Sequence, residues 1–154
     1  MERESGGRPR YRKAPPLIRR VLLPAVNALS RMGLTYANSG LLTVAGRKSG
    51  RPFDATVNVL DLDGGRYLVA PRGETHWVRN LRAAGNCTLQ LGRSKAEYRA
   101  LELSDGDKPP FLRAYLERWA GQVPGQFAVN WPGATEAELA AIAADHPVFA
   151  LDRA

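Results

Sequence analysis

The stretch from residue 41 to residue 52, LLTVAGRKSGRP, most constrains what this chain can fold into. A short apolar run enters a turn that is bounded by Gly46 and Gly50, and apolar and polar residues then alternate from residue 53 to residue 62. A two-residue period with β-branched side chains is typical of a β-strand, so the pattern predicts strand, turn, strand. One face of the second strand is expected to carry Phe53, Ala55, Val57, Val59 and Asp61, and the other Asp54, Thr56, Asn58, Leu60 and Leu62.

The turn itself has the composition of an anion site. Gly46 and Gly50 allow positive φ and a close approach of the backbone to a ligand. The side chains of Arg47, Lys48 and Arg51, together with the turn amides, suit an anion with several oxygens. The alternative is a solvated hairpin turn that happens to be basic. A nucleotide triphosphatase loop is rejected, because the glycine spacing is one residue too long and a strand follows where a helix is required.

The rest of the chain predicts more strands and helices in an order that favours a barrel. Asp63-Gly64-Gly65 is a turn signal, Thr75 is expected to cap a helix that Gly85 ends, and Thr135 with Glu138 predicts a capping box. Strands are predicted at residues 36–45, 53–62, 66–70, 86–91, 96–103 and 148–151, and helices at 17–32, 76–84, 107–119 and 136–144. The hairpins are antiparallel, and no dinucleotide fingerprint is present. We therefore expect a mainly β fold with α-helices (α+β), a barrel of about six mostly antiparallel strands with helices packed outside.

The 154 residues predict one domain over residues 17–154, preceded by a basic, flexible segment over residues 1–16. Of the net charge of +7, residues 1–20 contribute +5, because they hold seven Arg or Lys and two Glu. The amphipathic helix at 17–32 either lies on an anionic membrane surface or packs on its own domain. No secretion signal and no span of about 20 apolar residues is seen, so we expect a cytoplasmic protein. The charge favours anionic partners, but nucleic acid is not among those we expect.

The residues that usually carry covalent or metal chemistry are scarce. Cys87 is the only cysteine, which excludes an internal disulfide, and His76 and His146 lie far apart, so no metal site is predicted. No Ser-His-Asp, Cys-His or paired-carboxylate pattern is evident. Cys87 falls in a predicted strand and is expected to be a buried thiol.

Three motifs together resemble one family. Residues 42–50 (LTVAGRKSG) with Pro52, residues 67–73 (YLVAPRG) and residues 76–81 (HWVRNL) are similar to the signatures of the deazaflavin (F420)-dependent nitroreductases. The similarity runs from about residue 34 to residue 103. It implies a split β-barrel of the flavin-reductase type that binds coenzyme F420, whose deazaflavin ring carries a phosphate and an oligoglutamate tail. In this class the hydride passes directly between cofactor and substrate, so the protein need not supply a nucleophile.

The resemblance also implies which residues bind the cofactor. The basic turn would hold the phosphate and the tail, and the loop after the third strand would add a second clamp. Trp77 and Asn80 match the helix that borders the cofactor site, although Trp77 could equally be a core anchor and Asn80 a residue that orients backbone. The predicted cofactor-binding residues are Arg47, Lys48, Ser49, Gly50, Arg51, Pro71, Arg72, Gly73, Trp77 and Asn80.

The predicted function is an F420-dependent oxidoreductase that passes a hydride between the reduced cofactor and a small conjugated acceptor of the quinone or nitro type. Some family members carry substrate-side tyrosines where this chain has Gln126, Phe127, Asn130 and Trp131, and the nearest, Tyr115, lies on a core-facing stripe. The pocket should therefore differ, and nitroimidazole reduction is not assumed. The alternatives are an FMN-dependent reductase on the same barrel and a non-catalytic module that binds the cofactor or a membrane surface. A homodimer and a peripheral membrane contact through the N-terminal helix complete the expectations.

Overall fold

The computed structural model describes residues 39–123 and 125–154, so the predicted flexible segment at 1–16 and the predicted helix at 17–32 lie outside the described residues. The strands are β1 (Ser39–Ala45), β2 (Pro52–Leu62), β3 (Gly65–Val69), β4 (Asn86–Leu91), β5 (Ser94–Glu102) and β6 (Val148–Arg153). The helices are α2 (His76–Ala84), α3 (Pro109–Trp119) and α4 (Glu136–Ile142), with short 3₁₀ turns η1 (Asp105–Asp107), η2 (Ala120–Gln122) and η3 (Ala143–Asp145).

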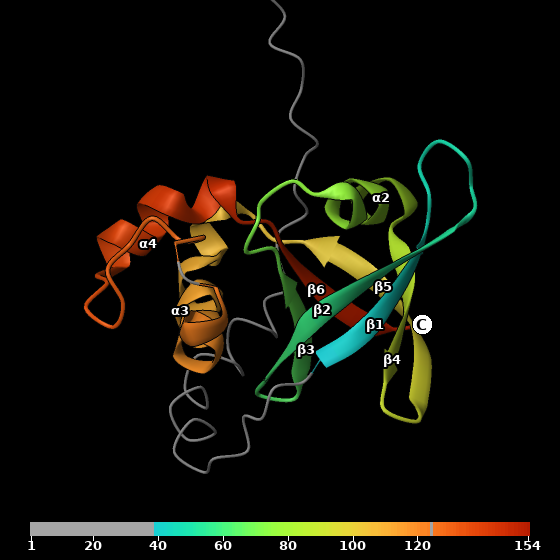
Figure 1. Ribbon diagram of the computed structural model, residues 1–154, viewed down its shortest axis with the longest axis horizontal. Helices are drawn as coiled ribbons and strands as arrows, with labels where there is room; N and C mark the ends of the chain where they lie inside the picture. Colours follow the sequence, from blue (N-terminus) through green and yellow to red (C-terminus); the bar gives the residue numbers. More distant parts are fainter. Residues whose placement is uncertain (1–38, 124) are drawn as a thin grey trace, which may run out of the picture.

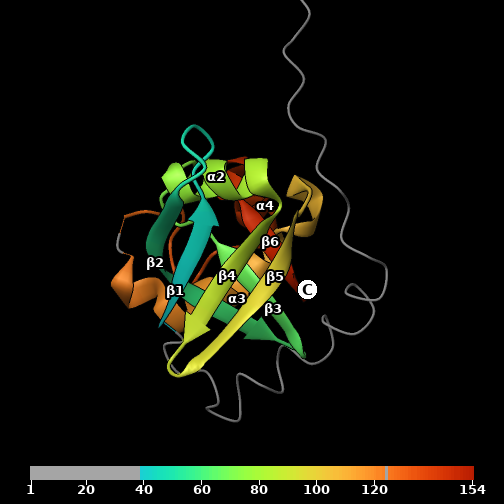
Figure 2. The same ribbon diagram turned by 90° about the vertical axis from the view of Figure 1, so that its right-hand side faces the viewer.

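The strands form a closed barrel in the order β1-β2-β3-β6-β5-β4, and every neighbouring pair within it is antiparallel. The helix α2 lies at one end of this barrel, whereas α3 and α4 pack together beside it (Figure 1). A view turned by a quarter shows the β1–β2 turn extending beyond the barrel near α2 and the β4–β5 turn at the opposite end (Figure 2). The predicted fold class, a mainly β barrel of six antiparallel strands with helices outside, is confirmed.

Two apolar clusters hold the fold together, one inside the barrel and one between the barrel and α3. Successive residues of β2 divide between them: Val57 and Val59 belong to the inner cluster, and Leu60 and Leu62 to the outer one. The predicted alternation of β2 is therefore confirmed, because side chains of a strand point to opposite faces in turn. Val78 of α2 joins the inner cluster, so α2 seals the end of the barrel with apolar side chains.

The turns follow the sequence signals closely. Asp63 and Gly64 adopt φ of 51° and 75° between β2 and β3, and Gly85 ends α2 with φ of 73°. The boundaries of several predicted elements shift: β2 and β3 each begin one residue earlier than predicted, and α4 ends at Ile142, where η3 takes over. The helix α3 starts at Pro109 because η1 precedes it and proline suits a first helical position, and β5 starts at Ser94 because the turn before it holds two residues only. The last strand extends to Arg153 through its pairing with β5.

The two predicted helix caps have different outcomes. The Thr135 hydroxyl accepts a hydrogen bond from the Glu138 N–H (3.2 Å), as expected for the start of α4. Thr75 precedes α2 in an extended conformation, but its side chain makes no capping hydrogen bond, so this part of the prediction is wrong. Its hydroxyl oxygen is instead buried with no hydrogen-bond partner among the described residues.

Cys87 is buried inside the barrel, as predicted, and burial raises the pKa of its thiol to about 11. No helix within residues 39–154, residue 124 apart, is long and apolar enough to cross a bilayer.

Candidate functional site

A cavity of about 460 Å³ opens where β2 and β3 separate. The strand β2 pairs with β1 from Pro52 to Asn58, but it pairs with β3 only from Val59 to Leu62. Along residues 52–58 no described strand pairs with the other edge of β2. In an antiparallel ladder every second residue turns both its N–H and its C=O to one edge, so this free edge offers backbone donors and acceptors to a ligand.

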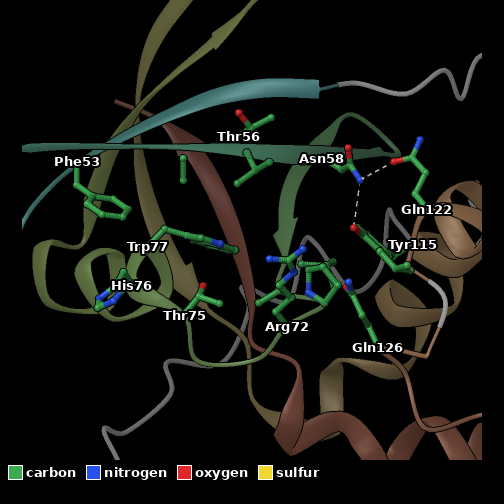
Figure 3. A pocket seen from close by; sticks show the side chains of 16 residues that line it. Phe53, Thr56, Asn58, Arg72, Thr75, His76, Trp77, Tyr115, Gln122 and Gln126 are labelled. Carbon is green, nitrogen blue, oxygen red and sulfur yellow. Dashed lines mark hydrogen bonds between the residues drawn. The ribbon is translucent and has the colours of Figure 1, made fainter.

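Three parts of the chain wall the cavity: the free half of β2, the loop from the end of β3 to the start of α2, and residues of α3, of η2 and of the stretch that follows η2 (Figure 3). A cavity of this size lies within the usual range of small-molecule sites. Its lining residues are Phe53, Ala55, Thr56, Val57, Asn58, Val69, Ala70, Pro71, Arg72, Thr75, His76, Trp77, Tyr115, Gln122, Val123 and Gln126.

One end of the cavity is aromatic. Phe53 and His76 face each other there with ring centroids 6.2 Å apart, and the Trp77 side chain points into the space (Figure 3). The Trp77 indole is half-buried and also packs against Phe149 of the barrel interior, with centroids 6.1 Å apart. Trp77 therefore packs in the core and also lines the cavity. The helix α2 begins at His76, as predicted.

The loop that follows β3 is tied to the segment before β6. The Ala70 N–H donates to the Pro147 carbonyl (2.9 Å), and His146 Nδ1 lies 3.0 Å from the Ala70 carbonyl oxygen. His146 is buried and stacks on Phe127 with centroids 4.1 Å apart. Burial lowers the pKa of this imidazole below its usual value, so Nδ1–H of the neutral ring donates the hydrogen bond that holds the loop.

Further along the loop, two contacts fix the position of Arg72. Gly73 has φ of 78°, and a Cβ there would lie 3.1 Å from the Asp145 carbonyl oxygen, so glycine is required for this close approach. Glu74 accepts from Arg82 of α2 (2.9 Å), which also pairs with the buried Glu102 of β5 (2.6 Å). Arg72 directly precedes these two contacts, and its side chain lines the cavity (Figure 3) without an ion-pair partner in the described part of the chain.

The other end of the cavity is polar and uncharged. Asn58 Nδ2 donates to the Tyr115 hydroxyl (3.2 Å) and to Gln122 Oε1 (3.3 Å), and Gln126 lies next to them (Figure 3). The Tyr115 ring is buried in the α3 cluster, as its stripe predicted, and burial raises the pKa of its hydroxyl. Gln126 Oε1 is a second buried oxygen in the cavity wall, and it too has no partner in residues 39–123 and 125–154.

The basic turn lies outside the cavity lining. Hydrogen bonds from the Gly50 N–H to the Gly46 carbonyl and from the Gly46 N–H to the Arg51 carbonyl close it, both at 2.8 Å. Asn80, which is 3% exposed, accepts from the Arg47 backbone N–H (3.1 Å) and from its guanidinium (2.8 Å). Asn80 thus orients backbone, and it docks the turn on α2. The side chains from Arg47 to Arg51 are all exposed.

The structure therefore divides the predicted site residues into three groups. Pro71, Arg72 and Trp77 line the cavity, and Gly73 shapes the loop that carries Arg72. Asn80 holds the basic turn through its hydrogen bonds to Arg47, and residues 47–51 of that turn are exposed to solvent. At the polar end, the resemblance had drawn attention to Gln126 and Tyr115, but the sequence did not single out Gln122 or Asn58, and the signal for Asn58 is the run of polar residues on one face of β2 that it ends. Among the described residues no three His, Cys, Asp or Glu gather as metal ligands would.

Several solved proteins are similar to this chain in fold. Atu2129 from Agrobacterium tumefaciens, described as of unknown function, has a TM-score of 0.55 and 19% identity over 91% of this chain, which spans 59% of that protein. The F420-H2 dependent reductase FDR-A has a TM-score of 0.53 and 18% identity over 75% of this chain and 94% of its own. A structure described as a domain-swapped dimer has a TM-score of 0.53 and 16% identity over 89% of this chain and 98% of its own.

The family follows from the sequence itself. The model of the F420H(2)-dependent quinone reductase family matches residues 25–129, more than half of the chain, and the chain belongs to this family. It is a family of oxidoreductases, and its cofactor is coenzyme F420, so the resemblance to deazaflavin-dependent enzymes is confirmed. No protein with a curated description matches the chain.

Proposed function

We propose that this protein transfers a hydride from reduced F420 to a small conjugated acceptor of the quinone or nitro type. The observation that carries the proposal is the cavity at the free edge of β2, with an aromatic end, a projecting Arg72 and a polar end. The acceptor class is inferred from this lining and from the family description, which names a quinone.

The aromatic half of the cavity fits the deazaflavin ring. A planar ring needs apolar walls, which Phe53, Val57 and Trp77 provide, and it needs partners for its ring carbonyl and N–H groups. The free edge of β2 offers such partners, because a strand edge alternates donors and acceptors. The buried hydroxyl oxygen of Thr75 lies in the same wall without a partner among the described residues, which is consistent with a ligand contact there.

The charged part of the cofactor fits the cations around the cavity. The phosphate would bind Arg72, whose guanidinium is within the cavity wall. The oligoglutamate tail carries several carboxylates that stay hydrated, and the exposed turn with Lys48 and Arg51 can bind them without burial. Asn80 would hold this turn in place through Arg47.

When bound, the reduced cofactor supplies the hydride, and the chain itself supplies position and shelter. Trp77 and Phe53 would exclude water from one side of the cofactor ring. Residues of α3 and η2 would close the far side of the cavity, so that the acceptor could bind only between them and the ring. No side chain is required to form a covalent bond with the substrate. This fits Cys87, the only thiol, which is enclosed in the barrel.

The experiment that tests the cofactor site is a titration of the purified protein with F420, followed by cofactor fluorescence, with FMN in parallel. Lys48→Ala with Arg51→Ala should weaken F420 binding about 10- to 100-fold, because two charge-assisted hydrogen bonds from exposed, solvent-screened side chains contribute about 1.5–3 kcal/mol together. The loss should shrink as salt is added. These two cations test the turn better than Arg47, whose guanidinium also supports the fold through Asn80.

The control is Arg93→Ala with Lys95→Ala, which removes the same charge from the β4–β5 hairpin at the opposite end of the barrel (Figure 2). It should leave the F420 affinity unchanged. Equal affinities for both double variants would refute the assignment of the basic turn, and preference for FMN would refute the cofactor. Binding of F420 without turnover of any quinone or nitro acceptor would favour the non-catalytic alternative.

A homodimer is the further partner that we propose, and light scattering of the purified protein measures it directly. A monomer mass at micromolar concentration would contradict it. The predicted membrane contact falls on residues 17–32, outside the described residues, and stays a prediction.

A further inference from the structure

The two ends of the cavity differ in chemistry, and the difference concerns the acceptor. Phe53, His76 and Trp77 give one end aromatic faces, and Arg72 adds a positive charge between the two ends (Figure 3). At the other end Asn58, Tyr115, Gln122 and Gln126 offer hydrogen bonds without any charge (Figure 3). If the anionic cofactor binds at the first end, as the proposed function requires, a neutral acceptor is left with the second.

The hydrogen bonds at the polar end leave one donor unused. Both amide hydrogens of Asn58 are committed, one to the Tyr115 hydroxyl oxygen and one to Gln122 Oε1. The Tyr115 oxygen already accepts from Asn58, so its own hydrogen must point elsewhere. No acceptor for that hydrogen lies within hydrogen-bond distance among the described residues. The hydroxyl is held at the cavity wall by a ring that packs on Trp119 and Phe127, with centroids 4.9 Å and 5.8 Å away.

We propose that Asn58, Tyr115 and Gln122 form the subsite that receives a carbonyl oxygen of the acceptor, with the Tyr115 hydroxyl as the hydrogen-bond donor. The inference rests on the proposed function and deepens it, because it selects uncharged acceptors with a conjugated carbonyl, such as quinones. A fixed donor at this place stabilises negative charge on the oxygen as the acceptor is reduced.

The step balances without a further reagent. Reduction of a quinone to its hydroquinone takes up one hydride, with two electrons, and one proton. The hydride comes from the reduced deazaflavin, and the proton that completes the hydroquinone comes from water. The Tyr115 hydroxyl keeps its own proton throughout, since burial raises its pKa, and it acts by hydrogen bonding alone.

The first test is Tyr115→Phe in the full-length protein, which keeps the ring and removes only the hydroxyl. With 1,4-naphthoquinone as acceptor, kcat should fall about 10- to 100-fold, as expected for one lost hydrogen bond to a developing charge. With N-methylphenazinium, a hydride acceptor that has no oxygen, the rate should change less than threefold. The matched control is Tyr67→Phe, because Tyr67 is buried in the same cluster but does not line the cavity.

A second variant tests the orientation of the hydroxyl. Asn58→Asp replaces a donor to Tyr115 by an acceptor, so the hydroxyl hydrogen should turn to the carboxylate and away from the substrate. This variant should lose as much quinone activity as Tyr115→Phe, although the tyrosine is intact. Combining the two changes should add little, because both remove the same hydrogen bond.

Binding measurements separate this inference from the proposed function. Quenching of tryptophan fluorescence by 1,4-naphthoquinone, without reductant, should show weaker binding to Tyr115→Phe than to Tyr67→Phe, whether or not F420 is present. Failure of the wild-type protein to bind F420 would overturn the proposed function and leave this quinone result standing. Equal quinone affinity in both variants, or an equal loss of rate with both acceptors, would overturn the subsite.

Discussion

The two halves of β2 show how one strand can serve stability and binding. From Val59 to Leu62 the strand pairs on the β3 side and is covered by the inner or the outer cluster, with Leu60 fully buried. From Pro52 to Asn58 it pairs with β1 alone, and its other edge borders the cavity. The strand therefore contributes to the core where β3 pairs with it, and to the cavity where β3 does not.

The largest effect should come from the buried half. Leu60→Ala removes a side chain that is packed against α3, so the free energy of unfolding should fall by about 2–5 kcal/mol. Thr56→Ala lies four residues earlier on the same face but is exposed, and it should change stability by less than about 0.5 kcal/mol. Urea unfolding of both variants measures the contrast, and similar losses would show that the two halves do not differ as described.

The next effect concerns Arg72, which lines the same cavity as the free half of β2 and should contribute to cofactor affinity rather than to stability. Arg72→Ala should weaken F420 binding about 10- to 100-fold and leave the unfolding free energy nearly unchanged, because this guanidinium supports no ion pair within the described residues. Arg79→Ala on the exposed side of α2 is the control for removal of one positive charge. A stability loss in Arg72→Ala, rather than an affinity loss, would place this arginine in the fold and not in the site.

Amide hydrogen exchange can map the boundary between the halves. The amides from Val59 to Leu62 that face β3 should exchange slowly, since the strand is paired there and its side chains are mostly buried. Every second amide from Phe53 to Asn58 faces the free edge of β2 and should exchange faster. Addition of F420 should slow the fast set selectively. Uniform protection along β2 before any ligand is added would contradict a free edge.

The smallest expected effect is a pH dependence at the loop that faces the free half. The pKa of His146 is lowered by burial, so between that value and about 6.5 the unfolded chain binds more protons than the folded one. The wild-type stability should therefore fall as the pH drops from 7.5 through this window, and His146→Gln should reduce the slope. A wild-type slope unchanged in His146→Gln would show that the Ala70 contact does not titrate.

The sequence predicted those features that depend on neighbouring residues. The alternation of Val57 and Val59 against Leu60, the turn at Gly64 and the helix end at Gly85 all follow from local stereochemistry, and each was found where expected. The motif residues led to the right family, because they combine the basic turn with the loop that carries Arg72.

What the sequence could not predict depends on long-range packing. Asn58 meets Tyr115 across 57 positions and Gln122 across 64, through the docking of α3 on the barrel, and no local pattern records that distance. The same is true of Asn80, whose partner Arg47 lies 33 positions away. The prediction of a side-chain cap at Thr75 was wrong because a threonine occupies the cap position, as the rule expects, but its hydroxyl is buried in the cavity wall.

The segment after α3 has a consequence for how such an enzyme can change over time. Gln122 and Gln126 reach the cavity from outside the barrel, so substitutions there leave the ladders of the six strands untouched. Under the proposed function, substitutions at these two positions would change the acceptor while the barrel and the cofactor site stay the same. A library of variants restricted to residues 122 and 126 should change the range of acceptors that are reduced, while the yield of folded protein stays nearly the same.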